Sequence, residues 1–179
     1  NYRLRSLTKY IAQLSMESNG KSINFDSTIS PLETSPLIWG GYGIDSQHST
    51  FQWMLQGKTP TSCDFIGINN EDSESKDSYE MLLSQVLAMT LGEDNKKENY
   101  KTVPGNNPCS VIQLNSLDLK TLGFLMALYE HKVFFEALIL GINPFDQWGV
   151  ELGKKIVKDA NGKNDFFSNY FPSDFIPKS

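Results

Sequence analysis

Cysteine and histidine are scarce in this chain, which has two of each among 179 residues. Cys63 and Cys109 lie far apart in apolar surroundings, without a CxxC pair or the Cys/His spacing of a zinc site. We therefore expect two buried free thiols in a reducing cytoplasm, with neither a disulfide framework nor a metal site. No other part of the sequence implies a cofactor.

A basic surface is also lacking. The chain has 16 Lys and Arg against 21 Asp and Glu, a net charge of −5, and its basic residues are scattered. Without a stripe of positive charge to neutralise phosphates, general nucleic-acid binding is excluded. A small anionic substrate remains compatible, because a pocket needs only local positive charge. The one cluster of like charge, residues 71–74, is acidic and is expected to be a solvated surface loop.

Neither a secretory leader nor a membrane span is apparent. The first five residues, Asn-Tyr-Arg-Leu-Arg, have no apolar run. The most apolar stretch, residues 122–142, contains Glu130, Lys132 and Glu136, whose charges are costly in hydrocarbon. We therefore expect a buried helix there and no membrane partner. The chain starts without Met inside a predicted helix, so we expect a piece of a longer polypeptide.

The apolar pattern predicts a packed domain in which helices and strands alternate. Leu4, Leu7, Ile11 and Leu14 recur at helical spacing, and Gly20 is a typical helix stop. Short apolar runs predict buried strands, and longer periodic segments predict helices. Alternation on this scale favours an α/β unit with a largely parallel sheet. We expect strands at 36–40, 63–68 and 111–114, further helices at 47–56, 79–91, 119–140 and 147–158, and an aromatic-rich tail from residue 161.

Three motifs carry titratable side chains beside turns or helix ends: 16–21 (Met-Glu-Ser-Asn-Gly-Lys), 46–48 (Ser-Gln-His) and 145–154 (Phe-Asp-Gln-Trp-Gly-Val-Glu-Leu-Gly-Lys). They supply the carboxylate of Glu17, the imidazole of His48 and the ammonium of Lys154. A helix end and burial in a pocket would both disfavour the ionised form of Glu17, which suits a base. An imidazole can donate and accept protons near neutral pH.

Each residue alone also has an ordinary interpretation. Glu17 fits an exposed helix end, and His48 fits a hydrogen-bonding residue in the first turn of a helix. Lys154 fits a surface partner of Glu151 on an amphipathic helix with Asp146 as its N-cap. The expected core face of that helix consists of Trp148, Leu152 and Ile156. His131, inside a predicted helix, is expected to be structural.

The order and spacing of the three motifs resemble the C-terminal part of the phosphoglucose isomerase family, up to about Lys158. The resemblance implies a sugar-isomerase-type α/β fold, a three-layer sandwich with a largely parallel sheet, present here as a C-terminal portion. Residues 1–144 would form part of that domain, and 145–179 a C-terminal helix and packing tail. Four shorter matches support it: Ile38-Trp39-Gly40, Cys63-Asp64-Phe65, Pro104-Gly105-Asn106 and Tyr129-Glu130-His131-Lys132.

The resemblance implies an aldose–ketose isomerase that interconverts glucose 6-phosphate and fructose 6-phosphate through an enediol(ate). Glu17 would be the base that moves the proton, and His48 and Lys154 would act in ring opening. Gln147 would contact the phosphate end of the hexose 6-phosphate substrate. In the family the histidine comes from the neighbouring subunit, which implies a homodimer.

The chain departs from the family in two ways. Residues 41–46 (Gly-Tyr-Gly-Ile-Asp-Ser) replace the usual Glu-Pro-Gly-Thr-Asn-Gly before Gln-His. No Ser/Thr-rich loop offers a convincing phosphate site, and in the family that cradle and an enediolate-stabilising Arg lie in the N-terminal half. We therefore expect about half of an active site. The alternative is a non-catalytic sugar-phosphate-binding module, but a sensor has no need of a proton base.

Overall fold

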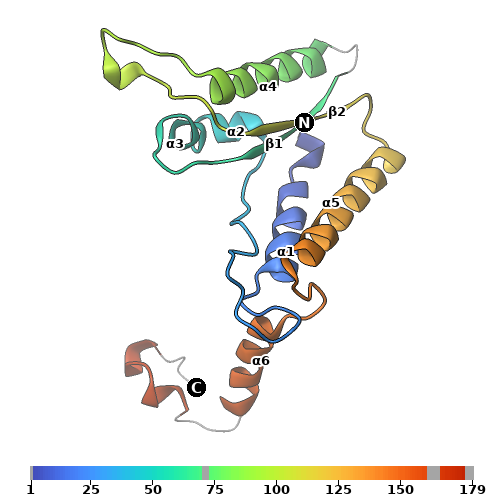
Figure 1. The fold of residues 1–179 in the computed structure, drawn as a ribbon, viewed down its shortest axis with the longest axis vertical. Coiled ribbons are helices and arrows are strands. Elements are labelled where there is room, and N and C mark those ends of the chain that lie inside the picture. The colour runs from blue at the N-terminus through green and yellow to red at the C-terminus, as the bar shows by residue number, and fades with distance from the viewer. Residues whose placement is uncertain (1, 70–72, 161–165, 176–179) are drawn as a thin grey trace.

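The computed structural model describes residues 2–69, 73–160 and 166–175 (Figure 1). Helices and two strands alternate along it, as the apolar pattern predicts. The helices are α1 (Leu7–Asn19), α2 (Gly43–Gln47), α3 (Phe51–Gln56), α4 (Ser73–Leu91), α5 (Leu119–Leu140) and α6 (Trp148–Ala160), and short 3-10 turns occur at Tyr2–Leu4, Asn99–Lys101, Phe167–Asn169 and Ser173–Phe175.

The two strands, β1 (Cys63–Ile68) and β2 (Cys109–Leu114), form a parallel pair. The pairing begins at Cys63 opposite Cys109 and ends at Ile68 opposite Leu114. This confirms the predicted parallel sheet, and β1 has the predicted bounds. Both thiols are free but only half-buried. Burial is the largest cause that raises the pKa of Cys63 to about 12, and the charges of the neighbouring Cys109 and Asp64 add to it. This thiol therefore stays protonated at neutral pH.

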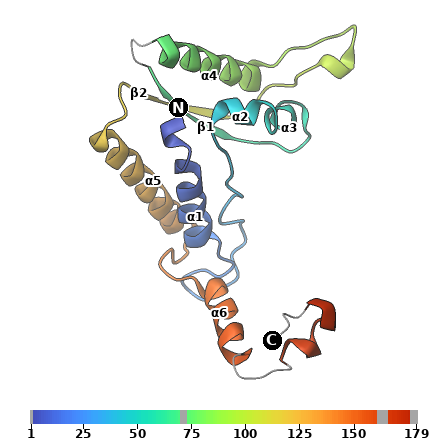
Figure 2. The same ribbon diagram turned by 180° about the vertical axis from the view of Figure 1, so that it is seen from behind.

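Apolar clusters cover both faces of the strand pair, which gives three layers. On one face, Ile68 and Leu114 pack with residues of α1 and α5, namely Leu7 and Leu125. The other face of the sheet is covered by α3 and α4, as Figures 1 and 2 show from opposite sides. There the cluster consists of Phe51, Met54, Phe65 and Met89. Each such buried side chain contributes about 1.5–3 kcal/mol, so the sheet anchors the domain.

The long helix α5 has the predicted bounds but is buried along one stripe only. Its buried residues recur every four positions, at Leu125, Tyr129, Val133 and Ala137. By contrast, Ile139 is 84% exposed. The expectation of a buried helix therefore holds for one stripe of α5 only, because α1 and the strands cover only one side of this helix. None of the described helices has both the length and the apolar character required to cross a bilayer.

Three other local predictions need correction. Residues 36–40 are extended but unpaired, with Leu37 80% exposed and the Ile38 amide donating to Met16 Sδ at 3.4 Å. The predicted helix at 47–56 is two shorter helices, α2 and α3, separated at residues 48–50. The helix predicted from residue 79 starts at Ser73, inside the expected acidic loop, of which residues 71–72 lie outside the described residues.

After α4, two glycines allow two backbone segments to approach each other closely. Gly92 and Gly105 both have a positive φ, 64° and 68°, which an L side chain rarely adopts. A Cβ on Gly105 would lie 2.6 Å from the carbonyl carbon and oxygen of Leu91. Asn106 also has a positive φ, of 59°. The Pro-Gly-Asn motif at 104–106 is thus a turn that presses one backbone segment against another.

We expect Gly105→Ala to lower the free energy of unfolding by about 2 kcal/mol or more, because both the strained φ and the backbone clash oppose the methyl group. The measurement is urea denaturation followed by circular dichroism. Gly123→Ala is the matched control: Gly123 lies in α5 with open space around its Cβ position, so this change should stabilise by about 0.5–1 kcal/mol. Equal effects of the two substitutions would contradict the tight turn.

Candidate functional site

Glu17 lies in the last turn of α1 and is half-buried. Its Oε2 accepts a hydrogen bond from Gln13 Nε2 at 3.0 Å, one turn earlier on the same helix. The helix ends where the sequence predicts, since Asn19 is its last residue and the Gly20 amide donates to Met16 O at 3.0 Å. The candidate base is therefore held on a regular helix rather than on a loop.

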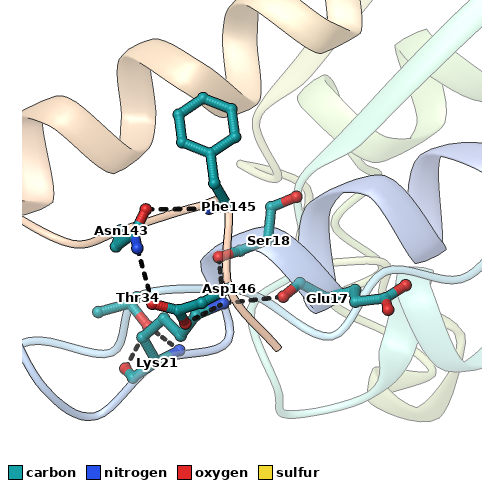
Figure 3. Close-up of polar contacts among 7 residues, drawn as sticks. All are labelled: Glu17, Ser18, Lys21, Thr34, Asn143, Phe145 and Asp146. Carbon is teal, nitrogen blue, oxygen red and sulfur yellow. Dashed lines mark hydrogen bonds and ion pairs between the residues drawn. The ribbon is translucent and has the colours of Figure 1, made fainter. Parts of the chain in front are cut away.

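The end of α1 is capped by the side chain of Lys21 (Figure 3). Its ammonium donates to the carbonyl oxygens of Glu17 at 2.9 Å and Ser18 at 2.6 Å. Such carbonyls have no partner within the helix, and a cation there also offsets the negative helix end. Burial lowers the pKa of Lys21, while the charges of Asp146 and Glu17 act in the opposite direction.

The same ammonium faces the loop that leads into α6. Lys21 Nζ lies 4.0 Å from Asp146 Oδ1, and Asp146 Oδ2 accepts from Asn143 Nδ2 at 2.7 Å. Asn143 Oδ1 in turn accepts from the Phe145 amide at 3.1 Å. Since α6 starts at Trp148, Gln147 rather than Asp146 directly precedes it. The Asp146 carboxylate thus faces Lys21 and Asn143 and does not occupy the expected N-cap position.

Thr34 fixes the backbone of Lys21. The Lys21 amide donates to Thr34 Oγ1 at 3.0 Å, and the Thr34 hydroxyl donates to Lys21 O at 2.6 Å. Thr34 is buried, so these bonds are shielded from water. Hydrogen bonds of both the main chain and the side chain therefore hold Lys21 in place.

Gln147 directly precedes α6, and Lys154 lies in the second turn of this helix. Lys154 is 67% exposed and donates to Glu151 Oε1 at 2.7 Å, the surface pair that the spacing predicts. The hydrogen bond to Glu151 raises the pKa of Lys154, Glu151's charge adds to this, and so does the charge of Glu17. Glu17 and Lys154 are thus within electrostatic range of each other. The expected core face of α6 is instead exposed, at Trp148, Leu152 and Ile156.

His48 lies apart from this group. It is exposed at the C-terminal end of α2, not in the first turn of a longer helix. The residue preceding α2, Tyr42, contacts Tyr2 just before α1 with ring centroids 6.0 Å apart. Figure 1 likewise shows α2 beside the sheet and α6 beyond the other end of α1. Because α1 has 13 residues, about 20 Å of helix separates the two ends. Among the described residues, no contact joins His48 to Glu17.

Asn19, which sequence reasoning missed, ties the end of α1 to α5. It is 1% exposed, and its Nδ2 donates to Val133 O at 3.1 Å and to Glu136 Oε2 at 3.4 Å. Its Oδ1 is buried without a hydrogen-bond partner among the described residues. The available signal was an Asn-Gly pair at a predicted helix end, inside the motif that carries Glu17.

Two further motifs meet between β1 and α5. Tyr129 Oη donates to Asp64 Oδ2 at 3.2 Å, and Lys132 Nζ lies 3.6 Å from the same oxygen. Burial raises the pKa of Tyr129, and the charge of Asp64 adds to this. His131 Nδ1 lies 2.6 Å from Ala127 O within α5, as expected for a structural helix residue. These motifs hold the helix against the sheet.

We expect Asn19→Asp to lower the free energy of unfolding by about 3 kcal/mol or more at pH 8, because it buries a carboxylate beside that of Glu136. Burial and the like charge raise the folded-state pKa of the new carboxyl above its unfolded value. The deficit relative to wild type should therefore shrink as pH falls from 8 to 5.

The control is Asn19→Leu, whose side chain has the same number of heavy atoms and the same branching but can form no hydrogen bonds. It should cost about 1–3 kcal/mol, with a deficit that is the same at both pH values. Urea titrations at pH 5 and pH 8 measure both variants. A pH-independent deficit for Asn19→Asp would show that position 19 is open to water.

Residues 1–170 match the family model described as Phosphoglucose isomerase. A protein named "Glucose-6-phosphate isomerase" from Ectopseudomonas mendocina is 39% identical over 182 residues, covering 89% of this chain and 33% of its own length. One of the same name from Sphingopyxis alaskensis is 40% identical, covering 92% of this chain and 34% of its own length. The chain thus spans about a third of the length of these relatives.

Solved structures show the same fold. The crystal structure of a glucose-6-phosphate isomerase from Chlamydia trachomatis has a TM-score of 0.84 and 37% identity, with 94% of this chain and 34% of that chain covered. A hypothetical protein from Thermus thermophilus has a TM-score of 0.66 at 17% identity, covering 90% of this chain and 40% of its own. The second likeness concerns the fold alone. The first confirms the α/β sugar-isomerase-type fold.

Proposed function

This chain belongs to the phosphoglucose isomerase family, and from that premise we propose that it forms the base-bearing part of a glucose-6-phosphate isomerase. The observation that carries the proposal is the meeting of two motifs: the end of α1, which carries Glu17, and the segment 145–154, which carries Gln147 and Lys154. Lys21 Nζ lies 4.0 Å from Asp146 Oδ1, and the charge of Glu17 acts on Lys154. They are far apart in sequence, yet Lys21 and Asp146 join them. Because the relatives are about three times as long, the activity is proposed for the longer polypeptide.

The proposed reaction moves one proton between neighbouring carbons. The Glu17 carboxylate takes the proton from C2 of the open-chain aldose, and the electrons of that bond form the C1–C2 double bond of an enediolate. Glu17 then returns the proton to C1, where the electrons of the C1–C2 double bond form the new C–H bond. The proton of the C2 hydroxyl passes to the C1 oxygen, which leaves a hydroxyl on C1 and the ketose carbonyl at C2. A half-buried carboxylate on a regular helix suits a base that must hold one position through both transfers.

Ring opening requires separate groups. We assign Lys154 and His48 to this step, and Gln147 to the phosphate end of the substrate. Within one chain His48 lies at the opposite end of α1 from Glu17, so a site that uses both needs a second chain to supply the imidazole. This separation supports a homodimer whose sites each combine Glu17, Gln147 and Lys154 of one subunit with His48 of the other.

We expect Glu17→Gln, made in the full-length protein, to lower kcat by about 10²-fold or more with little change in KM, because only proton transfer requires the base. Exchange of the substrate C2 proton with solvent should fall by the same factor. A coupled kinetic assay and NMR in deuterated water measure the two rates. Gln13→Leu is a matched control on the same helix face, and we expect a much smaller loss. An undiminished exchange rate in Glu17→Gln would remove Glu17 from the mechanism.

Mixing two inactive variants tests the shared site. If His48 acts across the interface, subunits of Glu17→Gln and His48→Ala exchanged at equal amounts should regain about a quarter of wild-type activity. Half of the dimers would then be mixed, and each mixed dimer would have one intact site.

A mixture of Glu17→Gln and Lys154→Met is the control, because both residues are assigned to the same subunit's site. That mixture should regain no activity. Recovery in the control mixture, or none in the His48 mixture, would contradict the assignment of His48 to the partner subunit.

A further inference from the structure

We propose that Lys21 is a positioning residue for the isomerisation, a clamp that sets the distance between Glu17 on α1 and the substrate-facing residues of α6. The inference rests on the proposed function and deepens it. Lys21 contacts the main chain of the base itself, through Glu17 O at 2.9 Å, and it faces Asp146, which directly precedes Gln147. One side chain thus reaches from the end of α1 to the loop that precedes α6, as Figure 3 shows.

The N–H groups of the Lys21 ammonium are directed at other groups of the protein. An ammonium has three N–H groups, of which two bond to the carbonyls of Glu17 and Ser18 and the third is available to the Asp146 carboxylate. The side chain is only 15% exposed, and Thr34 holds its main chain on both sides. Such a lysine is not available to bind substrate directly, and its charge is balanced inside the structure.

The far end of the clamp is equally fixed. Asp146 Oδ2 accepts from Asn143, whose Oδ1 accepts from the Phe145 amide, so the carboxylate cannot rotate without breaking the turn. The residue before this turn, Ile142, is fully buried. Movement of Lys21 would therefore shift the start of α6 relative to α1, or leave the carboxylate unpaired.

Displacement of the base by about 1 Å is enough to lower a rate about 10²-fold, even when substrate still binds. Lys21→Met in the full-length enzyme removes the charge and all three donors but keeps the length of the side chain. We expect kcat to fall about 10- to 100-fold with KM changed less than about threefold, and C2 proton exchange to fall with kcat. A change in folding alone would lower the active fraction and leave the rate per active site intact, so active sites are titrated alongside.

Lys9→Met is the matched control, since Lys9 is exposed on the same helix, and it should leave kcat unchanged. Asp146→Asn is the second variant, needed if Lys21→Met folds poorly. It leaves the carbonyl contacts of Lys21 in place and weakens only the link to α6, so kcat should fall about tenfold or less.

The double variant Lys21→Met/Asp146→Asn should be no slower than Lys21→Met, because both changes break one link. Additive losses, or an unchanged kcat in Lys21→Met beside an active wild type, would overturn the clamp and leave the proposed function standing. A full-length wild type without isomerase activity would overturn the proposed function, and the clamp's role in it as well.

Discussion

The packing of α1 along α5 is the constraint on which the candidate site depends. The two helices run in the same direction and touch at successive levels: Leu7 meets Leu125 in the core cluster, and Tyr10 Oη donates to Glu130 at 2.7 Å. At the far end Asn19 donates to the Val133 carbonyl. The first level is apolar and joins the sheet, whereas the last is polar and buried. Since α1 is a rigid rod between them, the position of Glu17 is set by the sheet at one end and by Asn19 at the other.

A helix end is a demanding place to build a site, because its last carbonyls need partners wherever water is excluded. Here the Gly20 amide bonds to the Met16 carbonyl and the Lys21 ammonium to those of Glu17 and Ser18, while Thr34 holds the backbone of Lys21. The same bonds fix the residue two positions before the helix end, which is Glu17. One set of hydrogen bonds thus both ends the helix and fixes the geometry of the candidate site, so a change at Lys21 acts on both.

The sequence predicts the helices and strands whose apolar periods are strong. It does not predict features that depend on contacts between residues far apart in the chain. β1 and α5 have the predicted bounds, because each is a largely apolar segment between clear stops. Residues 36–40 are equally apolar but find no partner strand in the described chain, and strand formation requires one. The site divides in the same way. The position of Glu17 in a last helical turn follows from the spacing of Leu7, Ile11 and Gly20, whereas the meeting of Lys21 with Asp146 depends on residues 125 positions apart and leaves no local signal.

Two positively charged groups lie near Glu17, although the chain as a whole is negative. The net charge is −5, yet Lys21 and Lys154 both lie within electrostatic range of this carboxylate. The two lysines differ in what they can do. Lys21 is largely buried and bonded to carbonyls, so its role is to hold structure. Lys154 is two-thirds exposed, and its only described partner is the neighbouring Glu151, in a surface pair of a kind that contributes little to stability. A phosphorylated sugar can displace such a partner at small cost, which is the physical reason to propose Lys154, and not Lys21, as the lysine that meets the substrate.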